Sequence, residues 1–277
     1  MKALPVKKGI EAFTLVEMLV VVSIIGVLAA LLLPALSNAK RSASRAGCLS
    51  NLRQLSLASK LYTGDNNGRL VASWPFGDGT NGPANPYSWC PGWASTRPHN
   101  STFGPAPQYT ATNIYALQQG RLWQYVGSAG VYRCPADRRN MEGQPVVRSY
   151  SMNGWINGKT HGDPGGDTRF TTPTNDAALT FVFFRTENQI THPAQIFDFI
   201  DEDESSINDS MFLVDVSEDT NSIQDLPTNR HGSSYNLGFA DGHFEAIKML
   251  APRTEWRYGG PSRDWVRLKT MATVRRQ

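Results

Sequence analysis

Residues 13 to 36 form a nearly unbroken hydrophobic stretch near the start of the chain. The stretch reads FTLVEMLVVVSIIGVLAALLLPAL and contains one charged residue, Glu17, among its 24 residues. As a helix it would be about 36 Å long, and the hydrocarbon core of a bilayer is about 30 Å thick. The pattern therefore predicts a membrane-spanning helix. Glu17 is costly within such a helix, which makes it a candidate functional residue.

After residue 36 the pattern changes to that of an amphipathic helix that continues the first one. One face carries apolar residues at helical spacing: Cys48, Leu52, Leu55 and Tyr62. Leu57 and Leu61 lie nearly opposite. A Gly-Asp-Asn-Asn-Gly turn at residues 64–68 ends the helix. We expect one face to meet the protein's own domain and the other to meet core residues or a neighbouring subunit.

We expect residues 65–277 to form one globular domain. Together with the long helix, this predicts an α+β fold in which the helix packs on a loop-rich antiparallel sheet. Residues 69–107 show no period and predict a long loop, and residues 112–125 predict a short helix. Further short strands are expected at 131–135, 149–152, 179–184, 196–202 and 211–216. Two strands at 235–240 and 243–249 flank Asp241-Gly242, which predicts a hairpin with a two-residue turn. For the basic segment 253–277 we predict no helix or strand, but we expect Trp256 and Trp265 to anchor it to the domain.

Charge is distributed unevenly along the chain. The net charge is only +3, which gives no reason to expect nucleic-acid binding. Residues 186–229 contain eleven acidic residues and no Lys or Arg. Hard cations prefer several oxygen ligands, so this run is a candidate calcium site, with a solvated acidic face as the alternative. Its candidate ligands are Asp198, Asp201, Glu202, Asp203 and Asp209.

The start of the hydrophobic stretch carries a recognisable motif. Phe-Thr-Leu-Val-Glu-Met-Leu, preceded by a basic leader, resembles the signal of type IV pilins and type II secretion pseudopilins. The resemblance implies cleavage between Ala12 and Phe13 by a prepilin peptidase and N-methylation of Phe13. It also implies a role for Glu17 in assembly and a helix kink at Pro34. Ala12 departs from the family pattern, which usually has Gly before the cleavage point.

Two other interpretations of this segment are a plain membrane anchor and a cleaved secretory signal. A secretory signal has an apolar region of roughly 7 to 15 residues, which is shorter than this stretch, and a plain anchor does not explain Glu17. We therefore expect a leader (1–12), a transmembrane helix (13–36), its continuation (37–64) and an extracytoplasmic domain (65–277). The resemblance places the chain once across the inner membrane with its C-terminal domain in the periplasm. The expected partners are membrane lipid, prepilin peptidase and other pilin-like subunits.

A second resemblance rests on the C-terminal half. The C-terminal half contains His231, nine residues and then Asp241-Gly242, together with Cys-Pro-Ala-Asp at 134–137 and the run DEDESSIND at 201–209. This combination resembles a pilin-like subgroup with this His-x9-Asp-Gly hallmark. Its members commonly have cysteines at the positions of Cys48 and Cys134. Because an exported domain favours oxidation, we expect a Cys48–Cys134 disulfide and a free Cys90, with Cys90–Cys134 as the alternative pair.

Other candidate chemistry is weaker. His231, Asp241 and His243 include metal-ligating residue types, but an Asp-Gly turn needs no metal. Trp74, Trp89 and Trp93 could form a sugar-stacking platform or plug a loop onto the core. We see no nucleophile or phosphate-binding motif and predict no enzymatic activity. The predicted function is a structural subunit of a type II secretion pseudopilus or a type IV pilus-like filament. The alternative is a membrane-anchored protein that binds a polysaccharide or protein ligand through its Trp-rich loops.

Overall fold

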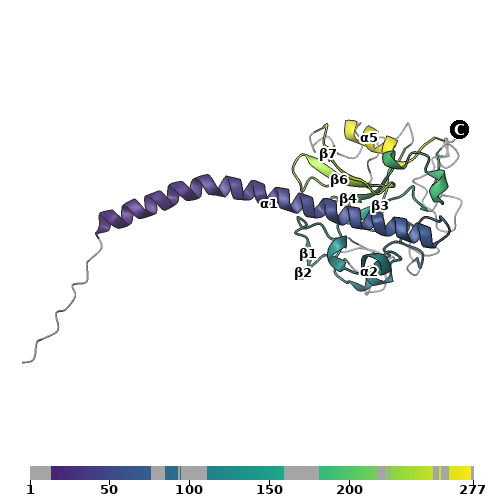
Figure 1. Cartoon of the computed structure of the whole chain (residues 1–277), viewed down its shortest axis with the longest axis horizontal. Coiled ribbons are helices and arrows are strands. Elements are labelled where there is room, and N and C mark those ends of the chain that lie inside the picture. The colour runs from purple at the N-terminus through teal and green to yellow at the C-terminus, as the bar shows by residue number, and fades with distance from the viewer. Residues whose placement is uncertain are drawn as a thin grey trace, which may run out of the picture. The chain divides into compact units, whose positions relative to one another are not determined.

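The computed structural model describes residues 14–75, 85–92, 94, 111–158, 181–216, 223, 225–251, 256 and 262–275. The chain divides into two compact units, residues 1–43 and 44–277, and each is described by itself. Helix α1 (Leu15–Asp65) has 51 residues and contributes to both units. In Figure 1 it is the long purple-to-blue helix.

The first unit is the apolar half of α1. Among the described residues, α1 is the one helix long and apolar enough to cross a membrane, and none of its most apolar window is buried. The large apolar side chains from Leu15 to Leu36 are exposed. Side chains of this kind are stable in lipid rather than water, as expected for a transmembrane segment.

The second unit is built on a five-stranded sheet with the order β5-β3-β4-β6-β7. Its strands are β3 (Tyr150–Asn153), β4 (Phe197–Asp201), β5 (Met211–Phe212), β6 (Ser234–Phe239) and β7 (Phe244–Lys248). The neighbours pair antiparallel except for β3 and β5, which are parallel. The α+β class with a long N-terminal helix is confirmed, and the sheet is mixed rather than purely antiparallel.

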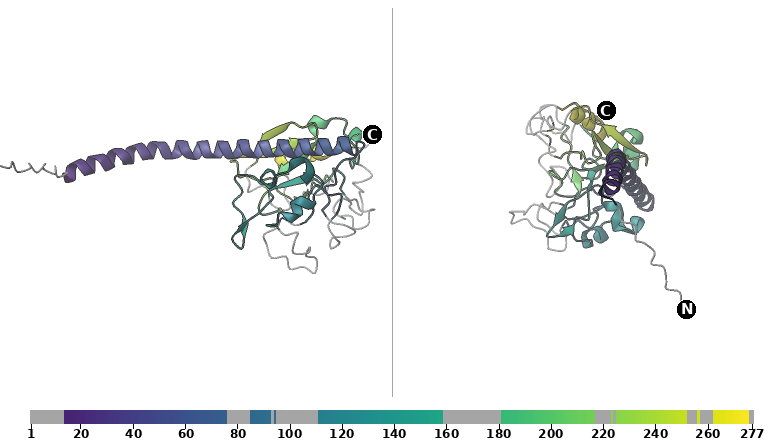
Figure 2. Two further views of the ribbon diagram at one scale, coloured as in Figure 1. Left: turned by 60° about the horizontal axis from the view of Figure 1, so that its bottom comes forward. Right: turned by 90° about the vertical axis from the view of Figure 1, so that its left-hand side faces the viewer.

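The second half of α1 packs against one face of this sheet, and Figures 1 and 2 show it between the sheet and the segment that contains α2. The predicted helix face is buried: Cys48, Leu52 and Leu55 are fully enclosed. On the opposite side, Leu57 and Leu61 are 53% and 50% exposed. The periodicity therefore predicted correctly which side of the helix meets the domain.

A β-bulge in β4 determines which side chains point at α1. Phe197 pairs with Phe239 and Ile200 with Leu237, so three steps on β4 match two on β6. An extra residue of this kind shifts the alternation of side chains along the strand. Both Asp198, which contacts Ser56 of α1, and Asp201, which contacts Cys48 of α1, consequently lie on the helix-facing side.

The helices on the α1 side of the sheet are shorter than predicted. The expected helix at 112–125 is two helices, α2 (Tyr115–Gln119) and α3 (Trp123–Val126). Between them, Gly120 is extended and lies so near Trp89 that a Cβ would sit 2.2 Å from the Trp89 carbonyl oxygen. The strand expected at 131–135 is wrong, because residues Ala129–Tyr132 form the 3₁₀ helix η2. A small hairpin, β1 (Asn140–Met141) with β2 (Gln144–Pro145), follows.

The segment before β4 contains little regular structure. The strand expected at 179–184 is not formed by the described residues 181–184, which make only isolated bridges, and residues 179–180 lie outside the described residues. Two short 3₁₀ helices, η4 (Glu187–Gln189) and η5 (Pro193–Gln195), precede β4. The Thr186 and Gln189 side chains form a capping box at the start of η4.

The hairpin β6–β7 forms as predicted, but its turn differs. The Gly242 N–H donates to the Phe239 carbonyl over 2.8 Å, and the Phe239 N–H donates to the His243 carbonyl over 2.9 Å. These bonds enclose a three-residue loop with Gly242 at φ +95°. A two-residue Asp-Gly turn would need positive φ at both residues, and Asp241 does not have it.

The C-terminal segment contains a helix that the sequence patterns did not predict. Helix α5 (Arg263–Ala272) buries Trp265, Leu268 and Ala272, which belong to the core on the sheet face that also carries Phe197 and Leu237. The expected anchors, Trp256 and Trp265, are both buried. A second core, around Leu52 and Phe199, lies between the sheet and α1.

Candidate functional site

The start of α1 carries a reciprocal pair of hydrogen bonds. Thr14 donates its N–H and its Oγ to Glu17 Oε2 over 2.8 and 2.7 Å, and the Glu17 N–H donates to Thr14 Oγ over 3.3 Å. This is the capping-box arrangement, which satisfies N–H groups that have no partner in the first turn. Glu17 is exposed within the first unit, so its carboxylate is at the surface of an otherwise apolar helix.

The other residues expected at the N-terminus are only partly described. Pro34 lies inside α1 and the helix is continuous through it, so the kink at this residue stays a prediction. Ala12 and Phe13, the expected cleavage pair, lie outside the described residues.

A buried cluster joins α1 to three other segments of the second unit. Cys48 comes from α1, Cys134 follows η2, Asp201 ends β4 and His231 lies at the turn before β6. Their ligand-type atoms all lie within 4.8 Å of one another. Cys48 Sγ donates to Asp201 Oδ2 over 3.3 Å, and His231 Nε2 lies 3.2 Å from both Asp201 Oδ2 and Cys134 Sγ.

Charged neighbours hold the cluster in place. Arg230 Nη1 lies 2.7 Å from Asp201 Oδ1, and the other carboxylate oxygen, Oδ2, faces Cys48 and His231. Asp137, from the Cys-Pro-Ala-Asp segment, accepts from Ser149 Oγ over 2.6 Å and pairs with Arg139 over 2.8 Å. Ser149 Oγ in turn accepts from the Cys134 N–H over 3.0 Å. The basic partners outweigh burial and lower the pKa of Asp137 to about 2.

The proton equilibria within the cluster are strongly shifted. The hydrogen bond with Cys48, followed by contacts with His231, outweighs burial and lowers the pKa of Cys134 to about 7. Burial raises the pKa of Cys48 well above its usual range. Burial opposes protonation of His231, but hydrogen bonds with Asp201 and Cys134 outweigh it and raise the pKa of His231 to about 9. Cys134 is therefore the cysteine that most readily becomes a thiolate.

The predicted disulfide is not formed in the structure. Cys48, Cys90 and Cys134 are all free and buried, although the expected partners Cys48 and Cys134 do lie together. All four members of the cluster were predicted from the sequence as functional residues, but at three different sites: a disulfide, a calcium site and a family motif. One signal could have indicated a common site: Cys48, Cys134 and His231 all belong to the same subgroup resemblance.

The five candidate calcium ligands do not form one site. Among the described residues, the cluster around Cys48 is the only close group of three or more His, Cys, Asp and Glu ligands, and of the five it includes only Asp201. Asp198 accepts from Ser56, Glu202 from Ser206, and Asp203 and Asp209 accept from nearby backbone N–H groups. Calcium binding by the acidic run stays a prediction that this arrangement does not favour.

The other suggested metal set is also divided. His231 is buried in the cluster, whereas Asp241 and His243 are partly exposed and pair with each other, with 2.6 Å between His243 Nδ1 and Asp241 Oδ1. The Asp241 carboxylate also accepts the His243 N–H over 3.0 Å. Asp241 and Gly242 therefore stabilise the loop of the β6–β7 hairpin, whereas His231 belongs to the buried cluster.

The Trp-rich segment does not offer the expected platform in its described part. Trp74 and Trp89 are buried, and Trp89 donates its indole N–H to the Ser210 carbonyl over 2.9 Å. Trp93 lies outside the described residues. Two of the three tryptophans are thus core residues.

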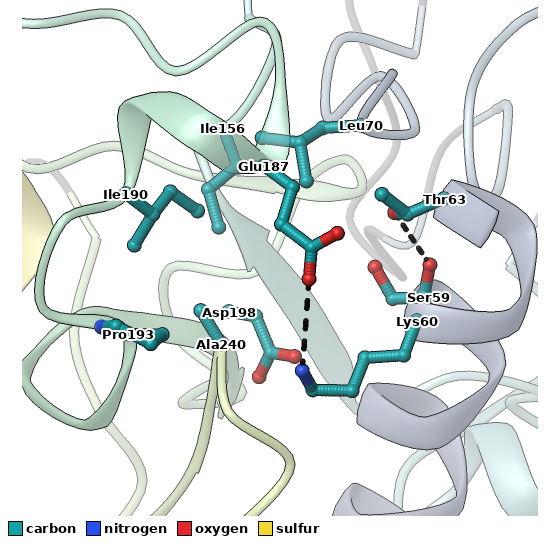
Figure 3. A pocket seen from close by; sticks show the side chains of 10 residues that line it. All are labelled: Ser59, Lys60, Thr63, Leu70, Ile156, Glu187, Ile190, Pro193, Asp198 and Ala240. Carbon is teal, nitrogen blue, oxygen red and sulfur yellow. Dashed lines mark hydrogen bonds and ion pairs between the residues drawn. The ribbon is translucent and has the colours of Figure 1, made fainter. Parts of the chain in front are cut away.

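A small pocket lies between α1 and the sheet, and Figure 3 shows its lining. Lys60 of α1 reaches across it to Glu187 with 3.9 Å between Nζ and Oε1. Asp198 forms part of its wall and accepts from Ser56 Oγ over 2.8 Å. Burial raises the pKa of Asp198 to about 7.

Comparison with known proteins identifies one segment. Residues 7–33 match the family model described as a prokaryotic N-terminal methylation motif. No curated protein and no solved structure matches the chain. The matched residues include the leader residues Lys7 and Lys8, the expected cleavage pair, Glu17 and most of the apolar half of α1. The chain therefore carries a prepilin-type N-terminal methylation motif, and this motif overlaps the half of α1 that is long and apolar enough to cross a membrane.

Proposed function

We propose that the chain is a structural subunit that is cleaved by prepilin peptidase, remains in the inner membrane and assembles into a filament. The filament is a type II secretion pseudopilus or a type IV pilus-like fibre, and the C-terminal domain lies in the periplasm. The observation that carries this proposal is the methylation motif at the start of a helix with two different halves. One half is apolar and exposed, and the other is the buried core helix of a domain.

The exposed side of the second half supports assembly. Leu57 and Leu61 are half exposed on the side of α1 that faces away from Leu52. Apolar residues on one helix face favour contact with another helix or subunit. A neighbouring copy in a filament would cover them.

Glu17 supplies the assembly contact in this proposal. Cleavage creates a positive amine at Phe13, four residues before the carboxylate, and neither charge is stable in lipid. A neighbour displaced along the filament axis brings its amine level with Glu17, and the pair then removes two desolvation costs. In the uncleaved chain, Thr14 occupies Glu17 Oε2, so assembly would exchange an internal partner for an external one.

The test compares Glu17→Leu and Glu17→Gln with Thr14→Ala in the native host. Thr14→Ala removes the capping hydroxyl and keeps the carboxylate, so it reports what loss of the cap alone does. We expect both Glu17 variants to insert normally but to yield no sheared filaments, whereas Thr14→Ala yields filaments. The processed fraction of each variant is measured by mass spectrometry, so that a cleavage defect is not mistaken for an assembly defect. Normal filaments from Glu17→Leu at normal monomer levels would contradict the proposal.

The alternative of a membrane-anchored binding protein has less support. It relied on exposed tryptophans, and Trp74 and Trp89 are in the core. We therefore do not propose it as a second function.

A further inference from the structure

We propose that Cys48, Cys134, Asp201 and His231 bind one Zn²⁺ ion that fastens α1 to the globular domain. This site is separate from Glu17 and Phe13, so it goes beyond the proposed role in assembly. No ligand role has been assigned to this set by the comparisons, which match only residues 7–33.

The four side chains converge on one point, as metal ligands must. Zn²⁺ binds sulfur at about 2.3 Å and histidine nitrogen or carboxylate oxygen at about 2.0 to 2.2 Å, so the edges of a tetrahedral site are about 3.3 to 3.8 Å. Three of the observed separations are 3.2 or 3.3 Å, and all lie within 4.8 Å. Small side-chain shifts would therefore complete the tetrahedron.

The histidine geometry separates a metal site from a catalytic relay. In a nucleophile–His–acid relay the imidazole uses one nitrogen toward the nucleophile and the other toward the acid. Here a single nitrogen, His231 Nε2, faces both Cys134 Sγ and Asp201 Oδ2 at 3.2 Å. Nδ1 makes no hydrogen bond within the described residues. When one imidazole nitrogen, one thiolate and one carboxylate all point toward the same position, they are arranged as the ligands of a metal ion are.

The surrounding charges suit a divalent cation. Two thiolates and one carboxylate around Zn²⁺ leave one negative charge, and Arg230, at 2.7 Å from Asp201 Oδ1, neutralises it. The Asp137–Arg139 pair next to Arg230 adds no net charge. The thiolate–imidazole donor set favours zinc over calcium or magnesium, which prefer oxygen ligands.

The burial of the site indicates a structural rather than a catalytic ion. Cys48, Cys134 and Asp201 are fully buried and His231 is 4% exposed. Four protein ligands leave no open position for water or substrate. The ion would join α1, the segment after η2, the end of β4 and the turn before β6. A Cys48–Cys134 disulfide would join only the first two of these and would leave the convergence of Asp201 and His231 unexplained.

The first experiment measures metal in the unaltered full-length chain. The protein is extracted in detergent without chelator, with thiols blocked at lysis in a parallel sample. We expect one zinc per chain by elemental mass spectrometry, and release of that zinc by a mercurial reagent. Replacement by Co²⁺ should give thiolate-to-cobalt charge-transfer absorption and the visible bands of a tetrahedral site. Substoichiometric metal in the extracted protein together with no tetrahedral cobalt spectrum would overturn the proposal, and so would a Cys48–Cys134 disulfide in the blocked sample.

Variants locate the site. Cys134→Ser and His231→Ala should lose stoichiometric zinc and the cobalt spectrum. Cys90→Ser is the matched control, because Cys90 is equally buried but lies outside the cluster, and it should retain both. Chelator should lower the melting temperature of the unaltered chain and of Cys90→Ser, and added zinc should restore it. Equal zinc content in Cys134→Ser and Cys90→Ser would show that the ion binds elsewhere and would refute this site.

Discussion

Gly238→Ala is the substitution that most directly probes how α1 is seated on the sheet. Gly238 lies in β6 beneath α1, where a Cβ would be 2.4 Å from Ser56 Oγ and 2.8 Å from Asp198 Oδ1. These are the two atoms of the hydrogen bond, 2.8 Å long, that joins α1 to β4. The added methyl group cannot fit unless that bond breaks or α1 moves outward.

The expected cost follows from these contacts. Overpacking of a close contact costs about 1 to 3 kcal/mol, and loss of the Ser56–Asp198 hydrogen bond adds about 1 kcal/mol. We therefore expect Gly238→Ala to lower the free energy of unfolding of the domain by about 2 to 4 kcal/mol. The control is Gly64→Ala near the end of α1, where no atom lies within 4 Å of the new Cβ. That change should stabilise the helix by about 0.5 to 1 kcal/mol.

The assay is urea unfolding of the full-length chain in detergent, followed by tryptophan fluorescence, since the buried tryptophans lie in the domain. A double-mutant cycle with Ser56→Ala tests the mechanism, because that change removes the nearer of the two obstructing atoms. Gly238→Ala should cost less in the Ser56→Ala background, with a coupling of about 0.5 to 3 kcal/mol. The close approach of α1 and β6 would be refuted by either of two results. One is an equal change in the free energy of unfolding for Gly238→Ala and Gly64→Ala. The other is a double mutant in which the effects of Gly238→Ala and Ser56→Ala simply add.

Two further predictions use the same unfolding assay. Asp198 has a pKa of about 7 in the folded chain against 3.8 for the ordinary group, because burial disfavours the charged form. Below pH 4 the carboxyl group is protonated in both the folded and the unfolded chain, and the folded chain has its full stability. That stability is lost as the pH rises through 7. Asp198→Asn should therefore gain about 4 kcal/mol relative to the unaltered chain between pH 4 and pH 8, and a constant difference across that range would contradict it. Leu52→Ala should cost about 2 to 5 kcal/mol because Leu52 is fully buried. Leu57→Ala on the exposed side should change stability by less than about 0.5 kcal/mol, and similar costs for both would show that the two helix faces are wrongly assigned.

Local patterns in the sequence were sufficient to predict the elements that depend on local spacing. The burial of Leu52 and the exposure of Leu57 follow from a 3.6-residue period, and the Asp-Gly pair marks the β6–β7 hairpin. The loop length was wrong because both a two-residue and a three-residue loop can use a Gly with positive φ. Only the conformation of Asp241 distinguishes them.

Features that depend on contacts between distant segments could not be predicted. The extra residue in β4, which places Asp198 and Asp201 on the same face, leaves no mark in the alternation of a strand buried on both sides. The cluster of Cys48 with Asp201 brings together α1 and the end of β4, and that register is set by the sheet. Helix α5 did carry Trp265 and Leu268 at helical spacing, but the many charged residues around them obscured the pattern.

The most direct test of the filament-subunit proposal is the N-terminal peptide of this chain recovered from filaments sheared off the native host. The proposal predicts that this fraction contains the chain, that its first residue is Phe13, and that the amine of Phe13 is methylated. Recovery of the chain only from membranes, with an intact Met1 or with a new terminus beyond the apolar half of α1, would contradict it.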